Sequence, residues 1–250
     1  MLKKQLYTFI LAITFFTRIP ILLKGIEFQE YSGRIALYLP LIGWIVGGFG
    51  AVVYLICHLI LPSSLSLLIS MLATIWITGA FHEDGFADVC DGFGGGSTKD
   101  KVLSIMKDSR LGTYGTLGLF SILALKYMAL YEMSENLIVI TLISAHSLSR
   151  WVSISLMLSH EYVASGQSKA GSVAVKMPVP QFLMAGVFGI APLIVYQNYL
   201  IFLALVPIAI VRVYFARLFS HKIGGYTGDC LGAVQQVSEL AFYLFVVAVL

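Results

Sequence analysis

Long apolar segments separated by short polar stretches make up most of the chain. A membrane-spanning helix needs about 20 mostly apolar residues, and seven segments meet this requirement. They are, approximately, 35–61, 65–81, 111–131, 137–158, 181–197, 199–217 and 233–250. These runs are continuous, whereas the strands of a membrane β-barrel alternate in polarity over about ten residues. The pattern therefore predicts an all-α, polytopic membrane helix bundle with about seven transmembrane helices.

A shorter apolar stretch, residues 5–17, precedes the first predicted span. It lies between Lys3-Lys4 and Arg18-Ile19-Pro20, and no small-x-small cleavage site follows it, which argues against a cleaved signal peptide. Apolar segments of this length are more often re-entrant or interfacial than spanning. We therefore expect a short N-terminal helix of that kind.

The composition agrees with a membrane protein. Charged residues make up 12% of the chain and hydrophobic residues 58%, whereas a soluble domain has about 25% charged residues. No domain-sized soluble insertion interrupts the sequence, so residues 1–250 are expected to form a single integral membrane domain. The net charge of +3 gives no indication of nucleic-acid binding, and the three cysteines lack the spacing of a metal site.

Lys and Arg residues in the loops fall on one side of the predicted bundle. That side carries Lys3, Lys4, Arg18, Lys24, Arg34, Lys99, Lys101, Lys107, Arg110, Lys169, Lys176 and Lys222. The opposite loops, 62–64, 132–136 and 198, contain no Lys or Arg. Because an excess of Lys and Arg marks the cytoplasmic side, the loop 82–110 is predicted to face the cytoplasm.

This loop region is also where the acidic residues concentrate. Of the 13 acidic residues, six lie between positions 81 and 115, namely Glu83, Asp84, Asp88, Asp91, Asp100 and Asp108. Asp84, Asp88 and Asp91 have the spacing i, i+4 and i+7, so they share one face if the preceding helix continues through them. Three carboxylates on one face repel one another unless a cation neutralises them, and Mg²⁺ or Mn²⁺ prefers oxygen ligands. The spacing predicts a metal site on these aspartates, with Glu83 as a further candidate ligand; a solvated acidic loop is the alternative.

The residues around the aspartates permit more than one interpretation. His82 has no second histidine at i+4, so a hydrogen bond to substrate or a place at the membrane edge is favoured over zinc. The glycines of residues 92–96 are expected to end the helix, because glycine is a poor helix former. Gly94, Gly95 and Gly96 form either a simple turn or a loop whose bare backbone lets a phosphate approach closely.

Two cations lie just before the span that begins near residue 111. Lys107 and Arg110 beside a helix N-terminus would make an anion site, because free N–H groups and the helix dipole add to their charge. Asp108 could bind metal or orient Lys107. The alternative is that both cations anchor the helix at the membrane interface.

Two further sites carry polar residues. Arg150 lies inside the predicted span 137–158, one turn from His146. Arginine in a membrane helix costs about 2.5–3.5 kcal/mol on insertion scales and usually points into a polar cavity, so a phosphate or carboxylate partner is favoured over snorkelling. A second Gly-rich loop, residues 224–232, contains Thr227 as a candidate substrate contact and Asp229 as a candidate metal ligand or base; a plain turn is the alternative.

These motifs together resemble the adenosylcobinamide-GDP ribazoletransferase family, also called cobalamin synthase. The similarity includes Asp-Gly-Phe-Ala-Asp-Val-Cys-Asp-Gly at residues 84–92 and Met-Lys-Asp-Ser-Arg at residues 106–110. It extends through residues 16–20, 149–150 and 224–233 and covers the whole chain.

The resemblance implies a transferase that joins adenosylcobinamide-GDP to α-ribazole or its 5′-phosphate and releases GMP. The product would be adenosylcobalamin or its 5′-phosphate, at the last stage of nucleotide-loop assembly in vitamin B12. It also implies a requirement for Mg²⁺ and a multi-pass location in the bacterial inner membrane, in contact with lipid, with self-association left open. On this interpretation Asp84, Asp88 and Asp91 hold Mg²⁺ while Lys107 and Arg110 bind the diphosphate. Asp108, Arg150 and Asp229 follow as further candidates.

Other enzymes and transporters fit the sequence less well. A CDP-alcohol phosphotransferase has Asp-Gly-x-x-Ala-Arg, but here Ala87 comes one position early and Asp88 follows it. The Asn-Asp-x-x-Asp motif of membrane prenyltransferases is absent from the sequence. A transporter would carry its acidic residues within the spans and show inverted repeats, whereas here the carboxylates concentrate in one loop.

Overall fold

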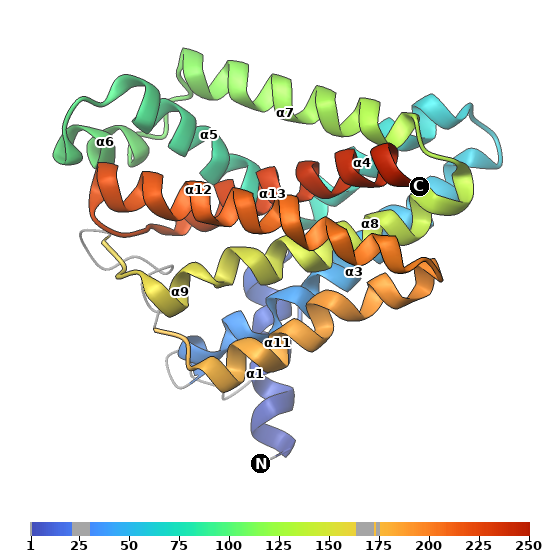
Figure 1. The fold of residues 1–250 in the computed structure, drawn as a ribbon, viewed down its shortest axis with the longest axis horizontal. Coiled ribbons are helices and arrows are strands. Elements are labelled where there is room, and N and C mark those ends of the chain that lie inside the picture. The colour runs from blue at the N-terminus through green and yellow to red at the C-terminus, as the bar shows by residue number, and fades with distance from the viewer. Residues whose placement is uncertain (1, 22–30, 164–172, 174–175) are drawn as a thin grey trace.

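The fold is a bundle of long helices whose connections lie at its two ends (Figure 1). This computed structural model describes residues 2–21, 31–163, 173 and 176–250, so Lys24 and Lys169 lie outside the described residues. The elements are α1 Leu2–Phe16, η1 Ser32–Tyr38, α3 Leu39–His58, α4 Ser63–Thr78, α5 Phe81–Gly95, α6 Lys99–Met106, α7 Thr113–Tyr131, α8 Glu135–Ile154, α9 Leu156–Ser159, α11 Val179–Ile190, η2 Ala191–Tyr196, η3 Tyr199–Ala204, α12 Leu205–Ile223 and α13 Gly228–Val249. Within the described residues, extended pairing is limited to an isolated bridge between Tyr162 and Tyr226. The predicted all-α membrane bundle is confirmed.

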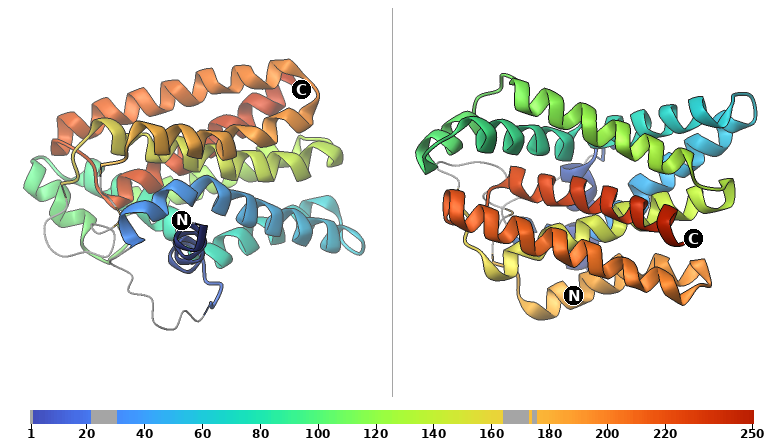
Figure 2. Two further views of the ribbon diagram at one scale, coloured as in Figure 1. Left: turned by 90° about the horizontal axis from the view of Figure 1, so that it is seen from below. Right: turned by 45° about the horizontal axis from the view of Figure 1, so that its top comes forward.

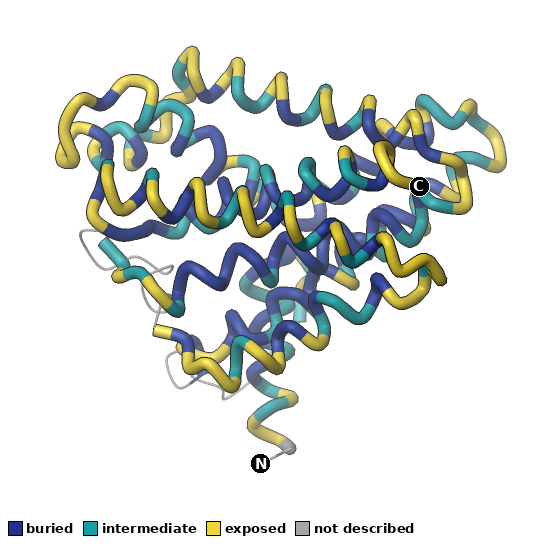
Figure 3. Tube along the Cα trace, viewed as in Figure 1, coloured by how far each residue is buried: buried dark blue, intermediate teal, exposed yellow. Residues whose placement is uncertain are grey.

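In the part of the chain that the structure describes, six helical segments are long and apolar enough to cross a membrane. They are Ser32–His58, Thr113–Tyr131, Glu135–Ser159, Val179–Tyr196, Tyr199–Ile223 and Gly228–Val249. Large apolar side chains on the outer faces of α7 and α12 are exposed, as expected of surfaces that meet lipid (Figure 3).

The predicted span 65–81 differs from the structure. Here α4 ends at Thr78, and the chain bends by 88° into α5, so the two helices form either a broken span or a re-entrant pair. The bend lies at Gly79 and Ala80, which have φ values of 68° and 60°. Left-handed backbone is costly for a residue with a Cβ, so Ala80 marks a break that the surrounding packing imposes. The acidic segment is therefore a helix of its own and does not continue α4.

A short N-terminal helix is present as predicted. Helix α1 has 15 residues, too few to span a bilayer, and it crosses the direction of the long helices (Figure 2). Its end contacts the bend between α4 and α5, because the Arg18 N–H donates to the carbonyl of Ile77 at 2.7 Å. Its position relative to a membrane stays a prediction.

Helix α8 is the buried centre of the bundle, and glycines allow its close packing. A Cβ on Gly43 of α3 would lie 2.3 Å from the His146 carbonyl oxygen, and one on Gly47 would lie 2.5 Å from that of Leu142. In lipid the hydrophobic effect does not drive helices together, so their association depends on van der Waals packing. Small residues strengthen this packing because they let the helix backbones approach closely. The polar side chains of α8 are thereby held inside the bundle.

The two sets of loops occupy opposite ends of the bundle. The α5–α6–α7 connection and the α12–α13 turn lie at one end, whereas the α3–α4 and α7–α8 turns and the C-terminus lie at the other (Figure 1). The α5–α6–α7 connection, which carries Lys99, Lys101, Lys107 and Arg110, therefore shares an end of the bundle with the α12–α13 turn, away from the turns that contain no Lys or Arg.

Candidate functional site

Helix α5 places its aspartates against the first turn of α13. A Cβ on Gly85 would lie 2.8 Å from the Cα of Asp229, and a Cβ on Gly232 would lie 2.9 Å from the His82 carbonyl oxygen. These two glycines let the helix backbones approach closely. Asp229 is thus brought beside α5 from a distant part of the sequence.

The result is a cluster of like charges. Asp88 is half-buried and interacts electrostatically with Asp229, Asp84 and Asp91, and Asp229 also interacts with Asp84. Like charges at short range raise the free energy of the folded state unless a cation neutralises them. The structure therefore brings together Asp84, Asp88 and Asp229, which the sequence placed in two separate motifs.

Asp91 has a different set of contacts from the other aspartates. Its Oδ2 accepts a hydrogen bond from the Gly112 N–H at 2.7 Å, and its Oδ1 accepts one from the Gly115 N–H at 2.8 Å. Both donors belong to the N-terminus of α7, where free N–H groups favour an anion. The anion at this helix end is thus a carboxylate of the chain itself, in the place where the sequence suggested a phosphate.

A divalent cation fits the chemistry of this cluster. Carboxylate oxygens are the ligands that Mg²⁺ prefers, and it usually keeps several waters beside one or two carboxylates. In the part of the chain that the structure describes, no group of three His, Cys, Asp or Glu side chains is arranged ready for one metal ion. Binding Mg²⁺ with Asp84, Asp88 and Asp229 would therefore require the side chains to rotate toward the ion.

The predicted cations lie at the surface beside this region. The side chain of Arg110 is 86% exposed, and its Nε donates to Asp108 Oδ1 at 3.0 Å. These hydrogen bonds hold the pKa of Asp108 below its ordinary value. Lys107 is also exposed, at the end of α6. The structure thus pairs Asp108 with Arg110, a contact that was not predicted from the sequence, where metal binding or the orientation of Lys107 were the suggested roles of Asp108.

The glycines after the aspartates are explained largely by packing. Helix α5 continues through Gly92 and Gly94 and ends at Gly95, with Gly96 as its C-cap, so the prediction that the glycines of residues 92–96 end the helix is confirmed. A Cβ on Gly94 would lie 2.5 Å from the Tyr114 ring, and one on Gly96 would lie 2.5 Å from a Val102 methyl. Close approach of α6 and α7 here overrides low helix propensity.

The second Gly-rich segment is a turn followed by a helix start. Gly224 ends α12 with φ of 77°, and α13 begins at Gly228, five residues earlier than the predicted span. Thr227 caps this helix by accepting from the Cys230 N–H at 3.4 Å, and its hydroxyl donates to Asp229 Oδ2 at 3.3 Å. Thr227 therefore has a clear structural role beside Asp229.

Three predicted site residues lie apart from the aspartates, inside the bundle. Arg150 is 2% exposed, and its Nη1 contacts both the ring Nδ1 and the carbonyl oxygen of His146 at 2.9 Å. Glu83 accepts from Gln236 Nε2 at 2.9 Å, and its electrostatic partners are Lys126, Glu239 and Arg150. His82 is buried, and its electrostatic partners belong to the same group. The hydrogen bonds of Glu83 and Arg150 are thus with the interior of the bundle.

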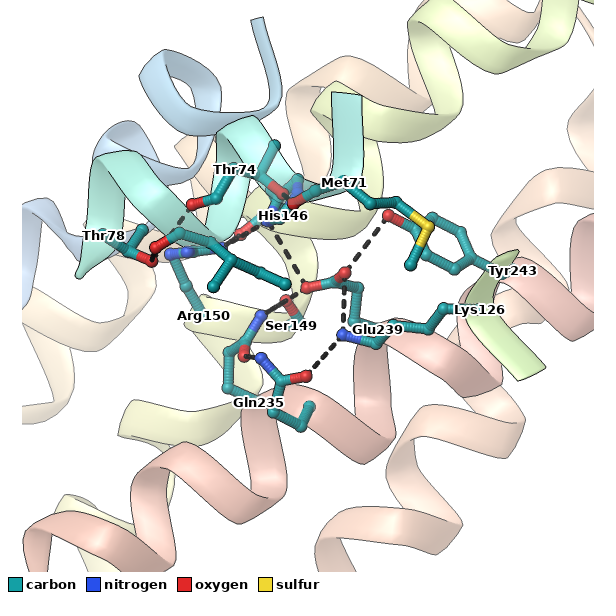
Figure 4. Close-up of polar contacts among 12 residues, drawn as sticks. Met71, Thr74, Thr78, Lys126, His146, Ser149, Arg150, Gln235, Glu239 and Tyr243 are labelled. Atoms are coloured by element: carbon teal, nitrogen blue, oxygen red, sulfur yellow. Dashed lines mark hydrogen bonds and ion pairs between the residues drawn. The ribbon is translucent and has the colours of Figure 1, made fainter. Parts of the chain in front are cut away.

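These residues belong to a buried polar network. Figure 4 shows its residues from α4, α7, α8 and α13, and Glu83 of α5 joins the network through Gln236. Lys126 Nζ donates to Glu239 Oε1 at 2.9 Å and to Gln236 Oε1 at 2.6 Å. Gln235 Nε2 donates to Glu239 Oε2 at 2.6 Å and to Ser149 Oγ at 3.0 Å. Both oxygens of the Glu239 carboxylate therefore accept hydrogen bonds, Oε1 from α7 and Oε2 from the preceding turn of α13.

The comparisons with known proteins point to one family. Residues 8–247 match a family described as cobalamin-5-phosphate synthase. An adenosylcobinamide-GDP ribazoletransferase of Shewanella frigidimarina is 40% identical over 250 residues, which cover 98% of this chain and 96% of the relative. Relatives of the same name from Ralstonia pickettii and Vibrio cholerae are 41% and 36% identical and cover 92% and 100% of this chain, and 90% and 96% of their own lengths. No solved structure matches the chain.

This chain belongs to the cobalamin-5-phosphate synthase family. The family resemblance stated from the aspartate and Met-Lys-Asp-Ser-Arg motifs is thereby confirmed. The match spans all the helices that carry the aspartate cluster and the buried network, so both features belong to the family domain.

Sequence reasoning missed part of this cobalamin-5-phosphate synthase domain. Lys126 lies in the middle of an apolar span, and an ionisable residue at such a position is itself a signal of an internal polar site. Gln235 and Gln236 offered no such signal, because neutral amides are common on many helix faces. Their role follows only from the helices that surround them.

Proposed function

We propose that this chain transfers the cobinamide-phosphate group of adenosylcobinamide-GDP to α-ribazole or its 5′-phosphate, releasing GMP. The observation that carries the proposal is the whole-chain match to relatives of that name, together with the aspartate cluster at one end of the bundle. The alternatives considered from the sequence, a CDP-alcohol phosphotransferase and a transporter, receive no support from these relatives.

The proposed reaction needs negative charge to be neutralised. A ribose hydroxyl forms a new O–P bond with the phosphorus next to cobinamide, and the P–O bond to the departing GMP breaks. Such phosphoryl transfers depend on positioning and on electrostatic stabilisation, with little covalent chemistry for the protein to perform. A chain with few charges that gathers four carboxylates at one end is suited to this task through a bound cation.

We assign the roles of the residues from their contacts. Asp84, Asp88 and Asp229 would hold Mg²⁺, which would supply charge neutralisation at the diphosphate. Asp91 fixes the N-terminus of α7 against α5, so that its part in metal binding is indirect. The exposed cations Lys107 and Arg110 would reach the phosphates of the incoming nucleotide, and Arg110 would exchange its partner Asp108 for a phosphate.

The site is proposed to face the cytoplasm of a bacterial inner membrane. The α5–α6–α7 connection carries Lys99, Lys101, Lys107 and Arg110, and loops rich in Lys and Arg are retained on the cytoplasmic side. Nucleotide substrates are present in that compartment, which fits the release of GMP. Lipid would cover the exposed apolar faces of α7 and α12.

Purified protein tests the proposal directly. In detergent or nanodiscs, it should release GMP from adenosylcobinamide-GDP only when α-ribazole or its 5′-phosphate and Mg²⁺ are both present. Asp88→Asn keeps the side-chain shape and removes the charge, so it should lower turnover on the order of a hundredfold or more, because metal charge stabilisation contributes several kcal/mol. Asp100→Asn, in exposed α6, is the matched control and should retain activity. GMP release that needs no metal, or that Asp88→Asn leaves intact, would contradict the proposed site.

A further inference from the structure

The buried polar network shares a helix face with the aspartate cluster. Asp229, Gly232 and Gln236 stand at i, i+3 and i+7 on α13, so they lie along one side of the helix. Along that side, Asp229 meets Gly85, Gly232 meets His82, and the Gln236 amide donates to Glu83. The side of α13 that contacts α5 thus runs from the carboxylate cluster to the buried polar network.

Gln236 occupies the junction between the two regions. Its Oε1 accepts from Lys126 Nζ at 2.6 Å, and its Nε2 donates to Glu83 Oε1 at 2.9 Å and to Gln235 Oε1 at 2.9 Å. Because Lys126 donates to the carbonyl oxygen, the orientation of the amide is fixed, and its N–H groups must point toward acceptors. Glu83 is one of those acceptors, and it precedes Asp84 directly in α5.

The network brings basic and acidic side chains together, which suits it to hold a helix. Two cations, Lys126 and Arg150, are buried with two carboxylates, Glu83 and Glu239. Lys126 and Glu239 have side chains only 4% exposed, at 2.9 Å from each other. Buried charges that are paired and hydrogen-bonded resist displacement, because moving one partner leaves the other unpaired. Such a group can fix a helix that is otherwise separated from its predecessor.

Helix α5 is such a helix. The chain bends by 88° between α4 and α5, at the left-handed residues Gly79 and Ala80, so α4 does not determine the direction of α5. Its position must therefore come from side contacts with α13 and α7. Oε2 of Glu83 is buried without a hydrogen-bond partner among the described residues and lines a cavity of about 20 Å³, room for roughly one water molecule. The other oxygen of Glu83, Oε1, accepts from Gln236, and this side-chain hydrogen bond holds the N-terminal end of α5 against α13.

We propose that Gln236, oriented by Lys126, is a positioning residue that sets the register of α5 on α13 and so places Asp84 and Asp88 opposite Asp229. This inference rests on the proposed function only for its effect on turnover. The position of α5 itself is a property of the protein without substrate, and it has a reporter of its own. Cys90 is half-buried on α5, and a Cβ on Gly118 of α7 would lie 2.7 Å from its sulfur.

The test measures thiol labelling and turnover in the same variants. A Cys57→Ser background leaves Cys90 as the accessible thiol, because Cys230 is buried. Gln236→Leu should raise the labelling rate of Cys90 severalfold and lower kcat about tenfold, the factor expected for losing a hydrogen bond to a charged group. Gln181→Leu, the same exchange on α11, is the matched control and should change neither quantity.

An exchange of the two side chains provides the rescue. Glu83→Gln with Gln236→Glu keeps a hydrogen bond between α5 and α13 and leaves a carboxylate beside Lys126. This double variant should restore the Cys90 labelling rate and most of kcat, whereas Gln236→Glu alone should not, because it sets a second carboxylate against Glu83 with no donor between them. If Gln236→Leu does not accumulate in the membrane, Gln236→Asn, which keeps the amide but shortens its reach, is judged by the same criteria.

The outcomes separate this inference from the proposed function. Unchanged Cys90 labelling and kcat in Gln236→Leu would overturn the inference, as would a double variant that stays as impaired as Gln236→Glu alone. If the unaltered protein releases no GMP, the proposed function fails, and Cys90 labelling still decides whether Gln236 positions α5.

Discussion

Two groups of charged residues in this molecule differ in how their charge is balanced. At one end of the bundle, Asp84, Asp88 and Asp229 interact as like charges on α5 and α13. In the bundle interior, Lys126 and Glu239 form a close pair. Two helices contribute to both groups: α5 carries Asp84 and Glu83, and α13 carries Asp229 and Glu239.

The difference indicates what each group is for. Like charges that repel one another weaken the fold, so they are kept where a ligand of opposite charge stabilises them. The interior group contains charges of both signs, so it does not need a charged ligand to stabilise it. Its main effect is to hold its helices in one arrangement. Removing a charge should therefore have opposite effects on stability in the two groups.

The largest expected effect tests this contrast directly. Glu239→Leu leaves Lys126 and Arg150 buried with less opposing charge, and breaking a buried pair costs about 3–5 kcal/mol. The thermal midpoint in detergent, measured without metal, should fall strongly. Asp88→Leu is the counterpart on α5 and should leave the midpoint unchanged or raise it, because repulsion is relieved. Equal destabilisation by both changes would show that the two groups do not differ in this way.

A smaller effect is expected at the surface cation Arg110. If Arg110 binds a phosphate with its planar fork, lysine cannot reproduce that geometry. Arg110→Lys should then lower kcat more than it raises KM, by about 1.5–3 kcal/mol or roughly ten- to a hundredfold. Steady-state release of GMP measures both constants. Arg34→Lys, at another exposed arginine, serves as control. Turnover like that of the unaltered protein would assign Arg110 to anchoring or solubility instead.

The smallest effect concerns Asp91. It interacts with Asp88 of the carboxylate cluster, but its own charge is stabilised by hydrogen bonds, as in the interior group. Asp91→Asn removes a charge and one of the two acceptors at the N-terminus of α7, so the stability should fall by about 1 kcal/mol. Thr98→Ala, which removes the cap of α6, should cost a similar amount. Thermal denaturation measures both. A stable Asp91→Asn variant with a raised Mg²⁺ requirement would return Asp91 to the metal ligands.

Much of the molecule could be predicted from the order of residues along the chain. Long apolar runs can satisfy their backbone in lipid only as helices, so the sequence determined an all-α membrane bundle, six of its spans and the shared side of the charged loops. The spacing of Asp84, Asp88 and Asp91 placed them on one helix face, and the motifs determined the family.

Only the tertiary structure decided how these elements meet. The bend at Ala80, the partnership of Asp229 with Asp88, and the binding of Asp91 to the N-terminus of α7 depend on helices far apart in the sequence. So does the role of Gln236, whose amide carries no charge that would mark it in a sequence. The spacing of polar residues in the sequence predicts which face of a helix is polar, because an α-helix has 3.6 residues per turn. Which partner that face meets depends on close contacts such as Gly85 with Asp229, and these exist only once the bundle has packed.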